Sequence, residues 1–411
     1  MPTRRLFAPA LLSLALALPL LYAKDVKDKE DKAADAAKGN ENPWPDKIAG
    51  RAVGDWIKDL KDPDPSVKEN ALRTLPLFGP PAAKAVPRIA ELLEKDLDVS
   101  TRVNAAIALR LIEVRKDDVP IVVKALLRRL NIRSRQLPLE YQAIVRFHAA
   151  ATLGRFGKEA HDAIPQLAVA AEDTASWEIR KVALGSLALI GGDQKKGPDA
   201  RAVSALLKGM SDQSAKVRLE AVMGIGTMGQ PTNAGLRRQV ITALQFRLKP
   251  KVEKDKTIVV WANISLMAID QLHENYVKEV EKLLASGNVP TRTHAARALG
   301  LVAGDLKKKA PKQVPGVIGA LRSALRDEEP AVAGMACWSF GEMAEDFVPP
   351  ADVEKTLTDL SKDKKIDEGV RQTALATLEY IKGKEKEKTK PKVEKPDDLK
   401  PPVTGKDKKG R

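Results

Sequence analysis

The chain has 411 residues and a formal net charge of +15, and 43% of its residues are apolar. Its one cysteine, Cys337, excludes an intramolecular disulfide, so core burial alone must hold the fold. The length suits two or three ordinary domains, but a chain of internal repeats forms one elongated body of any length. The presence or absence of repeats therefore decides the domain organisation.

The amino terminus has the pattern of a secretory signal peptide. Arg4 and Arg5 precede an apolar run that ends at Ala23, and a strongly charged stretch follows. Leu21, three residues before the expected cleavage point, is a weaker match than alanine, so an uncleaved membrane anchor remains the alternative. No other stretch is long and apolar enough to span a bilayer. The sequence predicts a signal peptide over residues 1–23 and an exported chain, periplasmic or secreted.

Residues 24–49 carry many charges and few apolar side chains, so we expect a disordered linker there. Trp44, in the sequence NPWP, is the exception. It is a candidate to fold back and cap the first structural unit.

Nine copies of one pattern follow, and their starting points lie 33 to 44 residues apart. Counting from a start called position 0, position 4 is alanine in every copy, position 7 is small, and positions 8 and 11 are large and apolar. These offsets fall on one stripe of an α-helix. The position-0 residues are Val67, Thr101, Val145, Ile179, Val217, Ile258, Thr291, Val332 and Val370.

Each of these helices follows a shorter predicted helix. Several of the shorter helices begin with an apolar residue and a proline, at Val86, Val119, Ile164 and Val314, and proline suits a first helical turn. After the second helices, glycines stand where a left-handed cap is expected. These glycines are Gly79, Gly157, Gly191 and Gly229. Each copy is thus predicted to be a helix, a turn and a second helix.

The stretches VRLEAVMGIGTMG and TRTHAARALGLVAG resemble HEAT repeats, in particular the HEAT-like repeats named after phycobilisome lyases. The resemblance covers about residues 50–382. It implies an all-α fold, a solenoid of about nine helix pairs wound into a right-handed superhelix, with the second helices on the concave side. It implies no activity, because such repeats serve many unrelated functions.

Charged residues recur beside the turn of each copy. Position 1 is basic in seven of the nine copies, and the residue five before position 0 is acidic in six. The resemblance implies that these residues form a structural ladder along the stack, interrupted where Val259 and Ala333 occupy position 1. The predicted bases are Lys68, Arg102, Arg146, Arg180, Arg218, Arg292 and Arg371, and the predicted acids are Asp62, Asp96, Glu140, Asp212, Glu253 and Asp327.

Two of the four histidines share an Arg-x-His-Ala-Ala motif, which raises the question of a metal site. His148 and His294 both occupy position 3, four repeats apart. Packed helices lie about 8–10 Å apart, so the two rings are expected on the order of 40 Å from each other, whereas metal ligands lie at about 2 Å. His273 with Glu274 forms a single His-Glu pair, although HEAT-like di-iron hydroxylases use several. No metal site is predicted.

Motifs for enzyme chemistry are absent from the sequence: there is no phosphate loop, nucleophile elbow, zinc-ligand spacing or paired-carboxylate motif. Cys337 is interpreted as a small buried hydrophobic residue. We predict a protein with no catalytic residue, no metal and no cofactor. The alternative is an enzyme or cofactor-handling protein related to the bilin lyases, although no arrangement of residues marks a bilin pocket.

Residues 102–158 hold 12 basic and 4 acidic side chains. Arg128, Arg129, Arg133 and Arg135 lie where a first helix ends and the longest inter-helix insertion begins. Charge of one sign attracts acidic partners, so these four are the candidate partner-binding residues; the alternative is a solvated loop without a ligand. Export and the lack of interleaved aromatic residues disfavour nucleic acid. An acidic protein or an anionic envelope polymer fits better.

Residues 383–411 alternate lysine with acids and prolines and are expected to form a disordered tail. The sequence as a whole predicts a solenoid over residues 50–382 that acts as a scaffold for protein–protein interaction. Its binding surface is expected to be the concave groove of the second helices or the basic region.

Overall fold

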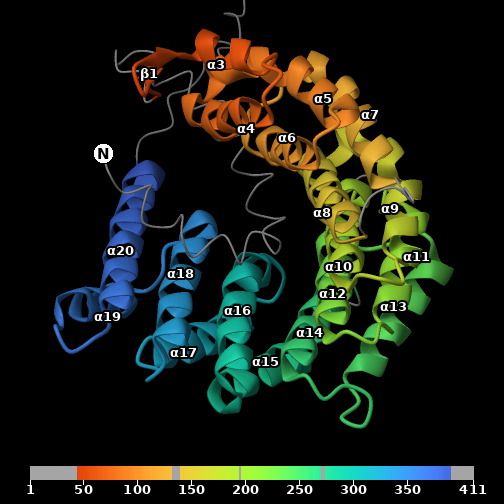
Figure 1. Cartoon of the computed structure of the whole chain (residues 1–411). Helices are drawn as coiled ribbons and strands as arrows, with labels where there is room; N and C mark the ends of the chain where they lie inside the picture. The colour runs from red at the N-terminus through yellow and green to blue at the C-terminus, as the bar shows by residue number, and fades with distance from the viewer. Residues whose placement is uncertain (1–43, 132–138, 194–195, 270–273, 390–411) are drawn as a thin grey trace, which may run out of the picture.

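The computed structural model describes residues 44–131, 139–193, 196–269 and 274–389. Within these ranges the chain forms nine consecutive helix pairs, α3 to α20, preceded by a two-stranded hairpin. The pairs stack side by side into a solenoid that appears as an open ring in Figure 1. The predicted α-solenoid of helix pairs is confirmed.

In each pair the first helix lies on the outer side of the ring and the second on the inner side (Figure 1). The first helices are α3 (Val53–Asp59), α5 (Val86–Lys95), α7 (Val119–Leu130), α9 (Ile164–Ala170), α11 (Ala200–Gly209), α13 (Ala234–Arg247), α15 (Glu274–Ser286), α17 (Val314–Ala324) and α19 (Ala351–Lys362). The second helices are α4 (Pro65–Thr74), α6 (Val99–Leu111), α8 (Leu139–Arg155), α10 (Trp177–Gly191), α12 (Ala215–Met228), α14 (Lys256–Ile269), α16 (Val289–Lys309), α18 (Pro330–Asp346) and α20 (Glu368–Thr389). Short 3₁₀ helices are η1 (Leu75–Phe78), η2 (Pro80–Ala85), η3 (Lys116–Asp118), η4 (Gly157–Ala163) and η5 (Pro311–Gln313).

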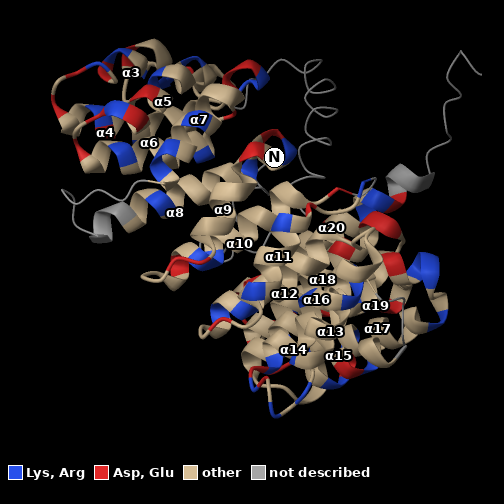
Figure 2. Cartoon of the chain, turned by 90° about the vertical axis from the view of Figure 1, so that its right-hand side faces the viewer, with Lys and Arg blue, Asp and Glu red and all other residues tan. Residues whose placement is uncertain are grey.

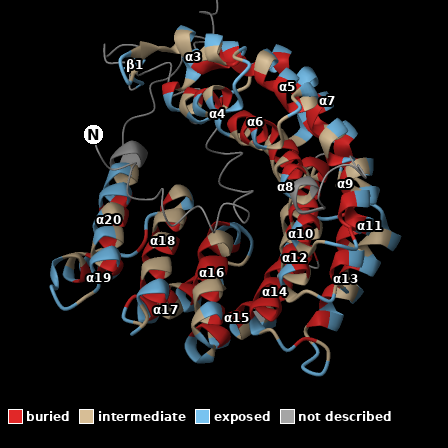
Figure 3. Ribbon diagram, viewed as in Figure 1, coloured by how far each residue is buried: buried red, intermediate tan, exposed pale blue. Residues whose placement is uncertain are grey.

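The core follows the repeated pattern of the second helices. All nine position-4 alanines have no exposed surface, and the large apolar residues at position 8 are buried as well. Figure 3 shows the resulting band of buried residues between the two layers of helices along the whole ring. An alanine at the centre of the stripe leaves room for neighbouring helices to pack closely. The recurring motif is therefore the packing seam of the solenoid. The position-4 residues are Ala71, Ala105, Ala149, Ala183, Ala221, Ala262, Ala295, Ala336 and Ala374.

Most of the predicted helix boundaries are confirmed. Proline occupies the first turn of α5, α7, α9 and α17. Gly79, Gly157 and Gly229 have positive φ angles of 66°, 52° and 81°, as left-handed positions after a helix require. Gly191 was wrongly predicted, because it lies inside α10 with no positive φ. Glycine is needed at this position because there is no room for a side chain: a Cβ there would lie 2.7 Å from the Cβ of Ala202.

Both ends of the described chain differ from the predicted boundaries. β1 (Lys47–Ile48) pairs antiparallel with β2 (Arg51–Ala52), so part of the expected linker belongs to the fold. The Trp44 indole lies against Gly79 at the end of the first pair, as its candidate capping role required.

At the other end, α20 continues to Thr389, seven residues into the stretch predicted to be disordered. Alternating Lys and Glu are good helix formers, and Lys384 Nζ lies 3.3 Å from the Glu345 carboxylate of the preceding second helix. The predicted signal peptide and the tail beyond residue 389 lie outside the described residues. Within the described part, none of the helices is long and apolar enough to cross a membrane.

Candidate functional site

Ion pairs join successive repeats along the turns of the solenoid. Five of the seven bases at position 1 reach forward to the turn acid of the next repeat, and these base side chains are only 10% to 18% exposed. The five pairs are Lys68–Asp96 at 2.6 Å, Arg146–Asp173 at 2.8 Å, Arg180–Asp212 at 2.6 Å, Arg218–Glu253 at 2.8 Å and Arg292–Asp327 at 2.8 Å. The acids also shape the turns, because each accepts a hydrogen bond from the backbone N–H two residues ahead.

Three predicted ladder residues have other contacts. Arg102 donates to the backbone carbonyls of Asp96 and Leu97. Its expected partner, Glu140, has a side chain outside the described part. Arg371 in the last repeat donates to the Ile366 carbonyl at 3.2 Å. Asp62 in the first repeat accepts from the Asp64 N–H at 2.8 Å. Within the described residues no repeat follows Arg371 and none precedes Asp62, so neither residue faces a partner across a junction there.

Opposing effects set the pKa values of the ladder acids. For Asp212, burial raises the pKa, but the hydrogen bonds from Arg180 and from the Ser214 N–H outweigh it and leave the pKa below its usual range. Asp173, Glu253 and Asp327 behave in the same way. These acids are therefore ionised at neutral pH, and the ladder is a set of charge-assisted bonds between repeats.

A second set of contacts, which the sequence analysis missed, locks neighbouring second helices together. The hydroxyl at position 7 of four repeats donates to the backbone carbonyl at position 5 of the preceding repeat, at 2.8 to 3.2 Å. Glycine at position 9 gives room for three of these hydroxyls; a Cβ on Gly226, for example, would lie 2.6 Å from Ser265 Oγ. The donors are Thr152, Ser186, Ser265 and Ser339.

The four candidate partner-binding arginines differ in their contacts and burial. Arg128, on α7, forms an ion pair with Glu94 of α5 and is half exposed. Arg129 is partly buried, and its Nε has no hydrogen-bond partner among the described residues. Burial lowers the pKa of Arg129, and the nearby positive charge of Arg102 lowers it further. Arg133 and Arg135 lie outside the described residues. Figure 2 shows the Lys and Arg positions along the ribbons of α6 to α8 in blue.

A further basic cluster lies at the other end of α6, where sequence reasoning did not place one. Arg155 of α8 donates to the carbonyls of Leu109, Arg110 and Ile112, so it binds the carboxyl end of α6. Arg110 itself is partly buried, and burial and the charge of Arg155 both lower its pKa. No described residue forms an ion pair with Arg110.

The two histidines of the shared motif sit in different surroundings. Burial, with a contribution from Arg110, lowers the pKa of His148 to about 4. His294 accepts a hydrogen bond at Nδ1 from Trp261 Nε1 at 3.0 Å. Burial, then the charge of Arg297, lowers its pKa to about 4 despite the opposing effect of Asp255. Both rings are thus neutral packing residues at physiological pH.

A buried glutamate lies on one of the inner helices. Glu220 of α12 is 6% exposed and receives no hydrogen bond from the described residues. Burial raises its pKa to about 7, although the charges of Lys181 and Arg297 act in the opposite direction. Its carboxylate lies over Gly185, where a Cβ would be 2.7 Å from Oε1. Sequence reasoning gave no role to this residue, because position 3 varies from copy to copy.

The remaining sequence candidates show no reactive arrangement. Cys337 is buried with a free thiol, as predicted, and burial raises its pKa to about 12. His273 lies outside the described residues. Within the described ranges, no group of three or more His, Cys, Asp or Glu side chains is placed to hold a metal ion.

Comparisons with known proteins found repeat profiles that match the sequence and solved structures that are similar to the chain. Sequence profiles for HEAT repeats and for a HEAT-like repeat match residues 54–137 and 289–343. Similar structures include an engineered protein, which is 22% identical with a TM-score of 0.42; the match covers 80% of this chain and 88% of the engineered protein. Importin beta is 12% identical with a TM-score of 0.43 over 80% of this chain and 46% of its own. A homology model of the AP-3 complex is 16% identical with a TM-score of 0.46, over 77% and 55%. No curated protein matches the sequence.

Proposed function

We propose that this chain of HEAT repeats is an exported, non-catalytic scaffold that binds an acidic protein through the basic surface of its second and third repeats. The observation that carries the proposal is the gathering of like charges at both ends of α6. Arg102 lies near Arg129 at one end, and Arg110 lies near Arg155 at the other. Eight residues of helix place these pairs about 12 Å apart.

Like charges held together and partly buried are unfavourable for the free protein. The lowered pKa values of Arg110 and Arg129 reflect that cost. Carboxylates of a partner place opposite charge beside Arg110 and Arg129, and guanidinium groups bind carboxylates with two parallel hydrogen bonds. The second helices that carry Arg110 and Arg155 line the inner side of the ring, so an acidic segment bound there runs along the concave face (Figure 1). The signal-peptide pattern at residues 1–23 supports export.

A matched pair of double variants tests this function. Arg110→Ala with Arg129→Ala removes two charges from the basic surface, and Arg237→Ala with Arg238→Ala removes two from the outer helix α13. Binding of a glutamate-rich peptide, measured by calorimetry, is expected to weaken at least tenfold in the first variant and to stay unchanged in the second. Circular dichroism checks that both fold. Equal binding by the wild type and the first variant would show that the basic surface is not the binding site.

The same variants serve in a pull-down from envelope extract. An acidic protein recovered by the wild type and the α13 variant, and lost by the Arg110/Arg129 variant, identifies the partner. Recovery of one set of proteins by all three excludes the proposed site.

A further inference from the structure

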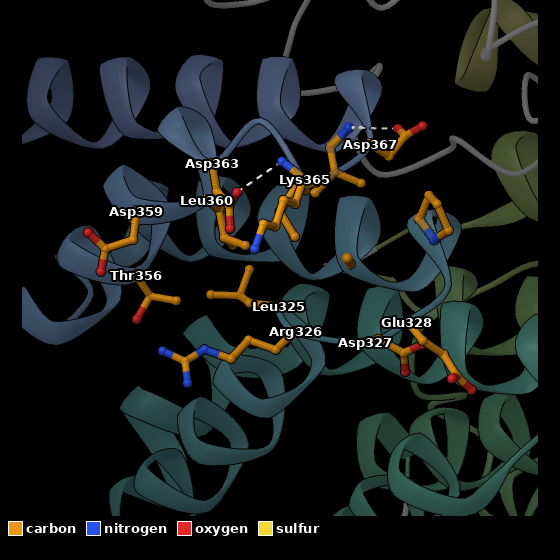
Figure 4. Close-up of a pocket in the computed structure, with 14 residues that line it drawn as sticks. Leu325, Arg326, Asp327, Glu328, Thr356, Asp359, Leu360, Asp363, Lys365 and Asp367 are labelled. Carbon is orange, nitrogen blue, oxygen red and sulfur yellow. Dashed lines mark hydrogen bonds between the residues drawn. The ribbon is translucent and has the colours of Figure 1, made fainter.

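The junction between the eighth and ninth repeats differs from the other junctions of the ladder. Ala333 stands at position 1 of α18, where the five intact junctions have arginine or lysine. A hollow of about 520 Å³ opens at this junction. It lies between the α17–α18 turn and the α19–α20 turn, and Figure 4 shows the side chains around it.

The acid of the ladder is still present at this junction. In intact junctions the turn acid accepts from the backbone N–H two residues ahead, as Asp327 does from Glu329 at 3.0 Å and Asp212 from Ser214 at 2.8 Å. Asp363 accepts from the Lys365 N–H in the same way, at 2.9 Å. Asp363 is therefore the counterpart of the ladder acids, although it lies seven residues before position 0 instead of five.

The group that is missing at this junction is a cation. At every intact junction the side chain of an arginine or lysine fills the space beside the turn acid. Arg180, Arg218 and Arg292 each hold their acid through two nitrogen donors. Asp363 has no ion-pair partner among the described residues. The same fold therefore holds a cation five times at the equivalent position and leaves this one open.

The lining of the hollow suits a long side chain with a cationic end. Its floor is made of buried apolar residues, including Leu325, Leu360 and Val370. Five acidic and two basic residues also line it, so the local charge is negative. The two bases, Arg326 and Lys365, form no ion pair with Asp363. In Figure 4 the Arg326 guanidinium lies on the opposite side of Leu325 from the Asp363 carboxylate.

We propose that this hollow binds an arginine side chain of a partner protein, which completes the ladder from outside the chain. The guanidinium group donates to the Asp363 carboxylate, as Arg292 donates to Asp327 one junction earlier. The aliphatic part of the arginine covers Leu360 and Val370. Lysine is a poorer ligand, because its ammonium group lacks the planar pair of donors that matches a carboxylate. This site lies six repeats from the basic surface and does not depend on it.

Titration of the full chain with N-acetylarginine amide, followed by NMR, tests the proposal. The blocked arginine is expected to bind more tightly than N-acetyllysine amide, and Asp363→Asn is expected to weaken it at least tenfold. Unchanged binding by Asp363→Asn overturns the proposal. Free L-arginine binding more tightly than the blocked amide overturns the assignment to a protein side chain, and points to a small-molecule site.

A second test fills the hollow with an arginine side chain of the protein itself. Ala333→Arg is expected to abolish binding of the probe and to raise the melting temperature, because it restores the missing pair with Asp363. Val259→Arg is the matched control, since Val259 is the other apolar residue at a ladder position and its side chain is buried. It is expected to lower the melting temperature and leave probe binding unchanged. If Ala333→Arg folds and still binds the probe, the site is not where the structure places it; if it does not fold, Asp363→Asn decides.

Discussion

Two glutamates in neighbouring repeats are both buried, yet their surroundings are opposite. Glu253, on the turn edge, is 1% exposed and accepts two hydrogen bonds from Arg218, at 2.8 and 3.0 Å. Arg247 Nη1 lies 3.5 Å from it as well. Glu220, on the inner helix α12, is 6% exposed and receives no hydrogen bond from the described residues. The solenoid pairs a buried acid with arginine at its turns and leaves another without a hydrogen bond from the described residues on its inner side.

The pKa values record this difference. Burial raises the pKa of Glu253, but Arg218 and the Asp255 N–H lower it more, so it lies below its usual range. Burial raises the pKa of Glu220 to about 7. A lowered pKa contributes stability that is lost as the pH falls, and a raised one contributes stability that is lost as the pH rises. The turn edge and the inner side are therefore expected to limit the stability of the protein at opposite ends of the pH scale.

The largest effect is expected from Glu253→Gln, which removes the charge at the centre of the turn edge. Arg218 and Arg247 are then left together, mostly buried, without the acid that both of them contact. Loss of one partner of a buried ion pair costs about 3 kcal/mol or more. Urea denaturation at pH 7 measures this loss. Glu279→Gln is the control, because Glu279 forms an exposed pair with Lys282 and its loss is expected to cost less than about 1 kcal/mol.

Glu220→Gln is expected to have the opposite sign and to depend on pH. Below about pH 4 the glutamate is protonated in both the folded and unfolded states, so the variant and the wild type should be equally stable. As the pH rises from about 4.5, the ordinary pKa of a glutamate, to about 7, the wild type loses stability on the order of 3 kcal/mol relative to the variant. Urea midpoints at pH 4 and pH 8 measure the change. A constant difference between the two proteins would contradict a buried, uncompensated carboxylate.

Ser265→Ala tests whether the inner side is held by hydroxyl contacts in place of ion pairs. Ser265 is buried and donates to the Val222 carbonyl of the preceding second helix at 2.9 Å. Loss of one such bond costs about 1 kcal/mol, and its effect should not vary between pH 4 and pH 8. Ser286→Ala is the control, because the exposed Ser286 donates only to Lys282 of its own helix. A loss as large in Ser286→Ala would show that the contact between helices is not the cause.

The sequence was sufficient for the parts of the structure that depend on a fixed register. Position 4 alanines and position 8 apolar residues lie on one helix, so a count from position 0 finds them in every copy. The same count does not find equivalent residues in the turns, because the length of the turns varies from copy to copy. Asp173 lies six residues before position 0 and Asp363 seven, and a search at five residues therefore misses both.

Contacts between repeats needed the three-dimensional structure. The Ser and Thr residues at position 7 were visible as small residues, but their acceptors lie 36 to 46 residues away in the preceding repeat. Arg110 and Arg155 likewise lie on different helices, and nothing in the charge count of residues 102–158 places them together. Variable turn lengths remove any fixed spacing that could have revealed these pairs.

The smallest effect is expected from Arg128→Ala, which extends the comparison from buried to exposed ion pairs. Arg128 and Glu94 are in contact, but the Arg128 side chain is 53% exposed, so water screens the pair. The free energy of unfolding should fall by no more than about 0.5 kcal/mol, far less than for Glu253→Gln. Urea denaturation measures it, with Lys208→Ala as the control, since Lys208 forms a similarly exposed pair with Glu172. If Arg128→Ala lowers the free energy of unfolding by more than about 1 kcal/mol and Lys208→Ala does not, the Arg128–Glu94 pair contributes as much as a buried pair, because exposed pairs do not reach that value.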